Sequence, residues 1–431
     1  MERTHPGTAR GTPHEGTNTD MGDDRGRIFI DPAAYTDLER WHAIAAELRA
    51  EGPLHRVELP DREPFWAVVG LPEIMEIEKN SDVFTNAPDP VMNPKGRMTE
   101  EREDSPVNTL IQMDGEEHKA HRQLVNEWFK PGEVKKLSDQ VALQAKRSID
   151  EMEARGGSCD FATDVAINYP LRVILDILGL PEEEFPKMLR LTQELFGDGD
   201  PDFQRAGEDD QAMAVIMDVI TLFTGLNAER RENPTTDLAT VIANGEIDGR
   251  PLEDVDTYGY YLIVATAGHD TTSNAVGGGM EALLEFPSEL AKVQADPSLI
   301  DGAADEIVRW VSPVKHFMRT ATRDYTLAGG QEIKEGDWLL LSYQSANRDE
   351  RVFEDPFTFD VTRPDSDKHL GFGFGRHYCL GAHLARLEIR ALFKELIPRL
   401  EHIEMAGVPA QTASVLVSGP KRLPVTYSFK S

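Results

Sequence analysis

A single cysteine in a glycine-rich stretch is the residue of this sequence best suited to chemistry. Residues 369–386 read HLGFGFGRHYCLGAHLAR, in which three glycines alternate with two aromatic residues before Cys379. From Leu380 onward the apolar residues recur at helical spacing. A thiolate at a helix N-terminus faces free backbone N–H groups and the positive end of the helix dipole, which lower its pKa. Such a loop suits one axial thiolate ligand on a haem iron.

Three other kinds of site could use parts of this loop. A dinucleotide-binding loop needs a glycine at position 376, where Arg376 stands. His377, Cys379 and His383 could bind zinc, but structural zinc sites usually bring more cysteines in paired spacing. A buried cysteine without chemistry would not require the alternating glycines. The haem-ligand interpretation is therefore preferred.

A second group of reactive residues lies in the middle of a predicted long helix, residues 252 to about 284. Its centre, AGHDTTS from residue 267, combines a glycine with an aspartate and β-branched residues, so it is a poor helix former. We expect a local widening of the helical hydrogen-bond ladder there, with room for a small ligand. The alternative is a threonine that only bonds the carbonyl four residues back.

The loop and the helix centre together resemble the cytochrome P450 family. The run Phe372-Gly-x-Gly-x-His377-x-Cys379-x-Gly381 fills every position of the family's haem-binding signature, and the helix centre is similar to its A-G-x-D-T element. The resemblance implies haem b as the cofactor and Cys379 as the axial ligand of its iron. It also implies the mainly helical P450 fold with a smaller β-rich part.

The resemblance assigns roles to further residues. Gly268 would let dioxygen approach the helix, Asp270 would relay protons inward, and Thr271 would hydrogen-bond the oxygen. The residues implied to bind the haem are His118, Arg122, Gly268, Arg319, Phe372, His377, Cys379 and Gly381. The residues implied to contact the substrate are Phe196, Ile263, Ala267, Val314, Phe317 and Val415. A buried structural triad would consist of Glu306, Arg309 and Arg363.

One of these assignments departs from the family's usual pattern. Asp114-x-x-x-His118-x-x-x-Arg122 matches the pattern whose last two members bind a haem propionate, but Gly115 and Glu116 stand where prolines are usual. Two basic residues four apart on a helix would otherwise be interpreted as a solvated pair.

Composition limits the partners and the compartment. The chain has 431 residues, and 76 acidic against 45 basic side chains give a formal charge of −31, which argues against nucleic acid and anionic membranes as partners. No run of 18 apolar residues and no signal peptide is present, so we expect a cytoplasmic protein without a membrane anchor. Residues 1–26 have the composition of a disordered tail, and the resemblance implies one P450 domain over residues 27–431.

The implied reaction is monooxygenation, in which one atom of dioxygen enters a C–H bond. The chain has no flavin or nicotinamide motif, so the resemblance implies a [2Fe-2S] ferredoxin and its reductase as electron donors. Within the family, the runs ATAGHDTT, FMRT and LSYQSANRDE are similar to the bacterial enzyme that hydroxylates α-terpineol. A small apolar substrate, a monoterpene or an alkyl-aromatic, is implied. A peroxide-driven peroxygenase and a non-catalytic haem-binding sensor remain alternatives.

Overall fold

The computed structural model describes residues 25–92, 95, 105–197, 199–205 and 211–430. Most of the predicted disordered tail therefore lies outside the described residues. Arg25 and Gly26, which the prediction placed in the tail, begin a helical turn.

Helices make up most of the described chain. The α-helices are α2 (Leu38–Glu51), α3 (Leu71–Lys79), α4 (Gly115–Asn126), α5 (Pro131–Val134), α6 (Ser138–Ala154), α7 (Asn168–Leu178), α8 (Phe185–Phe196), α9 (Gln211–Glu232), α10 (Leu238–Ala243), α11 (Asp254–Ala267), α12 (Asp270–Glu285), α13 (Pro287–Ala295), α14 (Ile300–Val311), α15 (Tyr343–Ala346) and α16 (Ala382–Arg399). The strands are β1 (Leu54–Val57), β2 (Phe65–Val68), β3 (Phe84–Thr85), β4 (Ser158–Asp160), β5 (Glu246–Ile247), β6 (Arg250–Pro251), β7 (His316–Ala321), β8 (Tyr325–Thr326), β9 (Glu332–Ile333), β10 (Trp338–Ser342), β11 (Leu400–Met405), β12 (Ala410–Gln411), β13 (Pro420–Arg422) and β14 (Pro424–Phe429).

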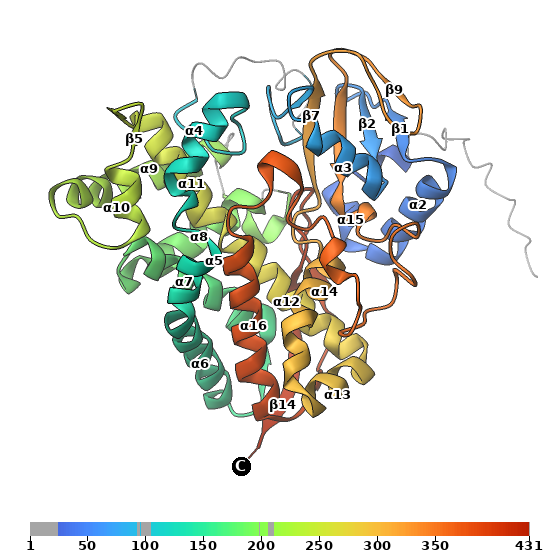
Figure 1. Cartoon of the computed structure of the whole chain (residues 1–431). Coiled ribbons are helices and arrows are strands. Elements are labelled where there is room, and N and C mark those ends of the chain that lie inside the picture. The colour runs from blue at the N-terminus through green and yellow to red at the C-terminus, as the bar shows by residue number, and fades with distance from the viewer. Residues whose placement is uncertain (1–24, 93–94, 96–104, 198, 206–210, 431) are drawn as a thin grey trace, which may run out of the picture.

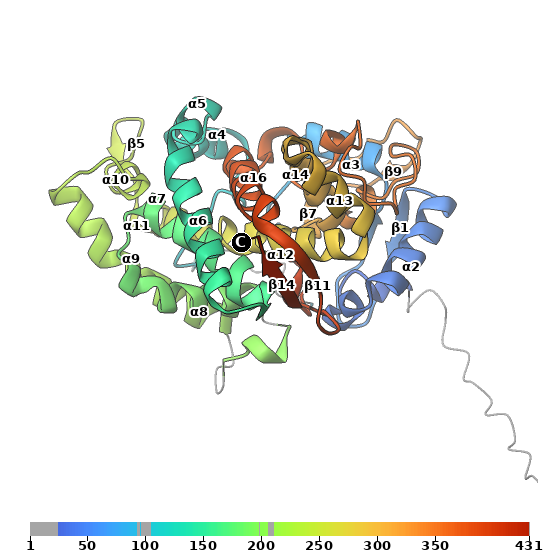
Figure 2. The same ribbon diagram turned by 90° about the horizontal axis from the view of Figure 1, so that it is seen from below.

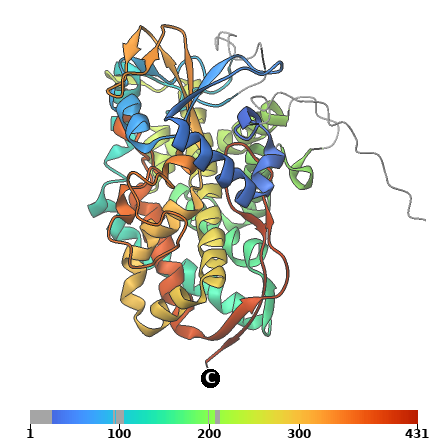
Figure 3. The same cartoon turned by 90° about the vertical axis from the view of Figure 1, so that its right-hand side faces the viewer.

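The strands and the helices occupy different parts of the molecule. The largest sheet has the strand order β1-β2-β10-β7-β3, in which β2 and β10 run parallel and the other neighbours run antiparallel. This sheet lies at the upper right of Figure 1 with α2 and α3 beside it, while α6 to α11 fill the left side. Figure 3 shows the same sheet at the top and the C-terminus at the bottom.

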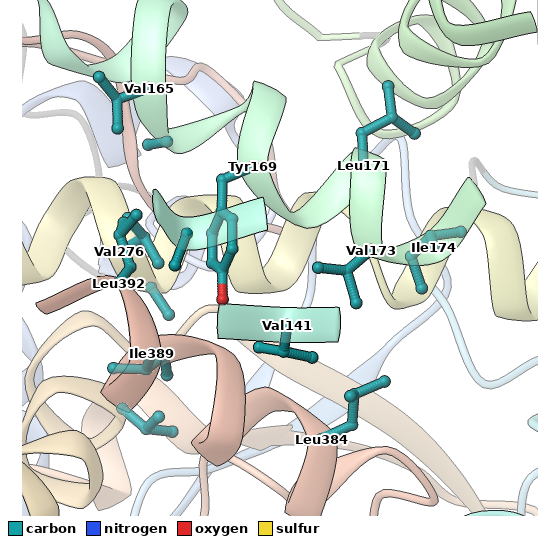
Figure 4. Close-up of a cluster of buried hydrophobic side chains, with 14 of the residues drawn as sticks. Val141, Val165, Tyr169, Leu171, Val173, Ile174, Val276, Leu384, Ile389 and Leu392 are labelled. Atoms are coloured by element: carbon teal, nitrogen blue, oxygen red, sulfur yellow. The ribbon is translucent and has the colours of Figure 1, made fainter. Parts of the chain in front are cut away.

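The two helices that carry the predicted chemistry pack against each other in the centre. Figures 1 and 2 both show α12 in the middle of the molecule beside α16. Figure 4 shows buried side chains around Tyr169, whose hydroxyl donates to the carbonyl oxygen of Glu388 at 3.1 Å. The apolar residues labelled around it are Val141, Val165, Leu171, Val173, Ile174, Val276, Leu384, Ile389 and Leu392. Burial of each such side chain stabilises the folded state by about 1.5–3 kcal/mol relative to leaving it exposed. The cluster therefore holds α12 in a fixed position relative to α16.

The predicted long helix is two helices. α11 ends at Ala267 and α12 begins at Asp270, so the disturbance expected at the helix centre is present as a break in the helix rather than as a local widening. Farther along α12, a Cβ atom on Gly278 would lie 2.7 Å from Val311, and one on Gly279 would lie 2.9 Å from Ile307. These glycines therefore let α12 approach α14 closely.

Among the residues that the structure describes, one helix, α9, is long and apolar enough to cross a membrane by length and composition, and 22% of its most apolar stretch of 18 residues is buried inside the protein. Its inner face packs onto α11, because Phe223 stacks on Tyr261 with ring centroids 4.5 Å apart. Val215 and Val219 on the same face are fully buried. α9 therefore lies at the surface with one face packed on the fold, and one such helix in the described part of the chain is weak support for a membrane span.

Candidate active site

The glycine-rich loop closes on itself and presents Cys379 just before α16. The backbone N–H of Cys379 donates to the carbonyl oxygen of Phe372 at 2.9 Å. Gly373 and Gly375 have φ values of 66° and 68°, in the left-handed region that favours glycine. A Cβ atom on Gly375 would also lie 2.4 Å from the carbonyl oxygen of Glu78, so no larger residue fits there. The alternating glycines are thus required by backbone conformation and by close packing on α3.

The predicted lowering of the Cys379 pKa is not found. Burial of the thiol raises its pKa above the ordinary value, and this effect outweighs the backbone N–H groups of Gly381 and Ala382 and the positive charges of Arg122 and Arg386. The helix end alone would lower the pKa, but the depth of the loop has the larger effect. The residues that would stabilise a thiolate are nevertheless in place, and a metal cation at the sulfur would add the missing positive charge.

The structure brings His118, Arg122 and His377 together beside the loop. The guanidinium of Arg122 donates to the carbonyl oxygen of Tyr378 at 2.6 Å, and the rings of His118 and His377 lie 4.1 Å apart. Burial lowers the pKa of His118 to about 3, so this side chain is neutral. Nδ1 of His118 and Nε2 of His377 are buried without a hydrogen-bond partner. Buried polar nitrogens of this kind usually serve a ligand.

Asp114 holds the start of α4 in place. Its carboxylate accepts the backbone N–H groups of Asn86 at 3.0 Å and of Ala87 at 2.9 Å, and His377 lies 3.8 Å from it. These bonds hold the pKa of Asp114 below its usual value despite partial burial. Gly115, which replaces a proline of the usual pattern, has a φ of 57°.

One row of side chains along α11 and α12 is partly exposed. Ile263, Ala267 and Thr271 follow one another at intervals of four residues and are half-buried, whereas most of their neighbours are buried. The hydroxyl of Thr271 donates to the carbonyl oxygen of Ala267 at 2.7 Å, which is the local bond that the alternative interpretation expects. A Cβ atom on Gly268 would lie 2.5 Å from Ile174, so this glycine lets α7 pack closely against the break.

Asp270 lies on a different face of α12 from Thr271. The side-chain amide of Asn274 donates to the Asp270 carboxylate at 3.2 Å, and burial raises the pKa of Asp270 to about 7. A cavity of about 320 Å³ reaches this carboxylate. It is also lined by Ser273, Asn274 and Phe196, so Phe196 lies beside Asp270, whereas Thr271 does not line this cavity.

The other predicted substrate residues lie on the β-rich side. Val314 forms an isolated bridge with Val417, which lines the same cavity. The rings of Phe317 and Tyr343 lie 6.2 Å apart. Val415 packs against the cluster of apolar residues around β1 and β2. Val314, Phe317 and Val415 are all half-buried.

The predicted structural triad is bonded together in the core. Glu306 accepts from the guanidinium of Arg309 at 2.6 and 2.7 Å and from Nε of Arg363 at 3.2 Å. Arg309 also donates to the carbonyl oxygens of Asn347 and Pro356 at 2.9 and 3.0 Å. Both members of the Glu306–Arg309 pair are fully buried.

Two residues at the site, His269 and Arg319, make contacts that have no signature in the sequence. His269, the variable position of the A-G-x-D-T element, bonds the carbonyl oxygen of Ile167 at 2.8 Å through Nε2 and the hydroxyl of Thr192 at 2.7 Å through Nδ1. Burial lowers its pKa to about 4, so the neutral ring ties α8 to the break between α11 and α12. Arg319 donates to the buried carboxylate of Glu78 at 2.7 Å.

The residues of the zinc alternative do not form a metal site. His383 is exposed, unlike Cys379. Among residues 25–92, 95, 105–197, 199–205 and 211–430, no three His, Cys, Asp or Glu side chains are grouped to hold a metal ion.

Comparison with known proteins agrees with the geometry. Residues 77–425 match the model of the family described as Cytochrome P450. Cytochrome P450-terp of Pseudomonas sp is 39% identical over 416 residues, covering 93% of this chain and 97% of that protein. Steroid C26-monooxygenase of Mycolicibacterium smegmatis is 35% identical, covering 89% of this chain and 90% of that protein.

Solved structures are similar along almost the whole chain. CYP108D1 of Novosphingobium aromaticivorans superposes with a TM-score of 0.86 at 41% identity and covers 95% of this chain and 99% of its own. CYP268A2 of Mycobacterium marinum, solved in complex with pseudoionone, has a TM-score of 0.85 at 32% identity and covers 93% and 97% of the two chains. The predicted mainly helical P450 fold is confirmed. This chain belongs to the cytochrome P450 family and is a haem-dependent monooxygenase.

Proposed function

We propose that this monooxygenase hydroxylates a small apolar molecule, either a monoterpene or an alkyl-aromatic hydrocarbon. The observation that carries the proposal is the half-buried stripe of Ile263, Ala267 and Thr271, whose hydroxyl is already bonded to the helix backbone. Half-buried Val314 and Phe317 add apolar surface. The names of two similar proteins, Cytochrome P450-terp and a P450 in complex with pseudoionone, also favour a terpene-sized ligand.

The substrate class is tested by optical titration of the ferric protein with a panel of monoterpenes, alkylbenzenes, steroids and branched lipids. We expect a shift to the high-spin spectrum with at least about tenfold tighter binding for the first two classes than for the others, which corresponds to about 1.4 kcal/mol. Steroids are included because one of the similar proteins is named Steroid C26-monooxygenase. Tighter binding of steroids than of terpenes and alkylbenzenes would contradict the proposal. Product analysis with each binding compound would separate a hydroxylase from a haem-binding sensor.

The residues beside Cys379 fit a haem. Three groups here are suited to bind propionate carboxylates. They are Nδ1 of His118, which has no hydrogen-bond partner, Nε2 of His377, which lies 3.8 Å from Asp114, and the guanidinium of Arg122. Arg319 would supply a second arginine, and Cys379 would ligate the iron. Phe372 and Gly381 would shape the loop against the ring. When bound, the haem supplies the redox centre at which dioxygen is activated.

The chain's own contribution to the reaction is proton delivery. Because burial raises the pKa of Asp270 to about 7, its carboxyl group can both hold and release a proton near neutral pH. Asn274 orients the carboxylate, and the adjoining cavity of about 320 Å³ has room for water molecules that would reprotonate it. Thr271 lies on another face of α12, so water would have to carry the proton from Asp270 to its hydroxyl, which would turn away from Ala267. The Cβ position of Gly268 is filled by Ile174 of α7, so the role of this glycine toward dioxygen stays a prediction.

Replacing Thr271 with alanine should leave haem binding intact and divert electrons to hydrogen peroxide. The hydroxyl is half-buried and bonded only to its own helix, so its loss should cost little stability. Positioned acid–base groups contribute on the order of 100-fold or more to such steps, and we expect product formed per electron consumed to fall by at least about tenfold. The measurement compares product, peroxide and nicotinamide consumed. Unchanged coupling would remove Thr271 from proton delivery.

Replacing Asp270 with asparagine should change the pH dependence of stability. The pKa of Asp270 rises from about 4 in the unfolded chain to about 7 in the folded protein, so stability falls as pH increases through this window. We expect the variant to match the wild type near pH 4 and to exceed it by up to about 4 kcal/mol above pH 7. Thermal melting from pH 4 to 8 measures the difference. The pKa of Glu281 is also raised to about 7, so this residue adds the same pH dependence to the stability of the variant and of the wild type. A difference independent of pH would contradict the assignment.

We further propose that electrons come from a [2Fe-2S] ferredoxin and its reductase in the cytoplasm, where both cysteines stay reduced. The sequence predicts a basic patch for an acidic partner, formed by Lys119, Lys130, Lys135, Lys136, Arg376 and Arg386. Acidic neighbours pair with most of these cations, which weakens the patch. The pairs are Lys119–Glu116, Lys130–Glu127, Lys136–Glu133 and Arg386–Asp305. Arg376 and Lys135 are exposed. Turnover with a ferredoxin system, compared with turnover on hydrogen peroxide alone, separates this proposal from a peroxygenase.

A further inference from the structure

A buried acid, Glu78, stands in the last turn of α3, where helix geometry alone would favour a base. The backbone carbonyls at a helix C-terminus carry partial negative charge, so a carboxylate there is unfavourable. Its side chain is also buried, with 1% of it exposed, and burial raises its pKa above the usual value. A carboxylate that is both buried and close to a helix C-terminus needs specific partners to stabilise it there.

Those partners are Arg319 and Tyr343. Oε1 of Glu78 accepts from Nη2 of Arg319 at 2.7 Å and from the hydroxyl of Tyr343 at 2.6 Å. Both partner side chains are buried. Oε2 of Glu78 has no hydrogen-bond partner, although the Phe374 amide is close enough to lower the pKa of the carboxyl group. The carboxylate therefore has one cation and one neutral donor.

The same carboxylate adjoins the glycine-rich loop. A Cβ atom on Gly373 would lie 3.7 Å from Oε1 of Glu78, and the backbone of Glu78 touches Gly375. Glu78 thus lies between Arg319, the arginine expected to bind a propionate, and the loop that presents Cys379. The positive charge of Arg319 is already balanced before any ligand carboxylate arrives.

We propose that Glu78 shares the charge of Arg319 with a haem propionate and thereby lowers the reduction potential of the iron. This inference rests on the haem placement of the proposed function. A fixed negative charge near the iron favours the ferric state, which carries one more positive charge than the ferrous state. Buried charge is one of the means by which a protein sets a haem potential.

The test replaces Glu78 with glutamine, whose amide oxygen can still accept from Arg319 and Tyr343 but carries no charge. We expect the ratio of ferrous to ferric protein at a fixed potential to rise about tenfold, equivalent to about 59 mV for one electron. Spectroelectrochemical titration of the holoprotein measures it. Thermal melting should also show a larger difference between haem-loaded and haem-free protein, because only a propionate can then balance Arg319. A purely structural role would lower both melting temperatures equally.

The matched control is Glu76→Gln on the same helix. Glu76 accepts from the hydroxyl of Tyr325 at 3.1 Å and from the Ala328 N–H, without contacting Arg319, so its variant should keep the wild-type potential. If Glu78→Gln does not fold, Glu78→Asp withdraws the carboxylate by one methylene and should raise the potential by a smaller amount.

Two failures are distinguishable. A normal thiolate–haem spectrum with an unchanged potential in the Glu78 variants would overturn this inference alone. A wild-type protein that binds no thiolate-ligated haem would overturn the proposed function and this inference together.

Discussion

Replacing Arg309 with methionine should prevent the protein from accumulating in folded form. The change removes the closest cation from the buried carboxylate of Glu306, which keeps Nε of Arg363 at 3.2 Å and the Asp360 N–H at 3.0 Å. It also orphans the carbonyl oxygens of Asn347 and Pro356. Breaking a buried ion pair by removing one partner costs about 3–5 kcal/mol, and each orphaned acceptor costs about 1–3 kcal/mol more. The total is comparable to the whole stability of an ordinary domain.

Soluble yield and the urea midpoint of the haem-free protein measure this effect. Arg399→Met is the matched control, because Arg399 pairs with Asp150, Glu153 and Glu395 but its side chain is 27% exposed. Exposed pairs contribute at most about 1 kcal/mol each, so this variant should fold with a slightly lower midpoint. If both variants lost the same stability, the Glu306–Arg309 pair would not be the anchor of this region.

Replacing Cys379 with serine should reduce monooxygenase turnover by about 1,000-fold or more, to the background of free haem. A hydroxyl is a far weaker donor to iron than a thiolate, and the push of electron density that favours O–O cleavage comes from the sulfur. The fold should persist, because the loop is closed by the backbone bond from position 379 to Phe372 rather than by the side chain. Product formation and haem content per protein measure the change.

The second cysteine provides the control for that experiment. Cys159 lies in β4, where burial raises its pKa to about 12, and it is a free thiol like Cys379. Cys159→Ser should keep the activity and the spectrum of the wild type. Retained turnover in Cys379→Ser, or an equal loss in both variants, would contradict the assignment of Cys379 as the ligand.

The sequence could predict what is encoded locally. The left-handed glycines at 373 and 375 and the irregular backbone between Ala267 and Asp270 follow from short runs of residues. The pairing of Glu306 with Arg309 follows from the family motif, because two such residues three apart also occur in many exposed helices. In each case the relevant partners are neighbours in the chain or parts of a recognisable motif. The family resemblance then linked these runs into one fold.

The contacts that the sequence could not predict join distant segments. Glu78 and Arg319 are 241 residues apart, and Thr192 and His269 are 77 apart, and neither Glu78 nor Thr192 belongs to a motif. The prediction of a lowered pKa for Cys379 was wrong for a related reason. Burial raises this pKa, and the depth of burial depends on how α3, α4 and α16 pack around the loop. Periodicity describes one element at a time and carries no information on such packing.

Ligation of a haem iron by the Cys379 sulfur can be tested by the absorption spectrum of the reduced wild-type protein under carbon monoxide. A thiolate ligand shifts the main band far to the red of histidine-ligated haem. We expect this red-shifted band at a stoichiometry of about one haem per chain. A band at the position of histidine-ligated haem, or protein that stays colourless when haem is supplied, would contradict it.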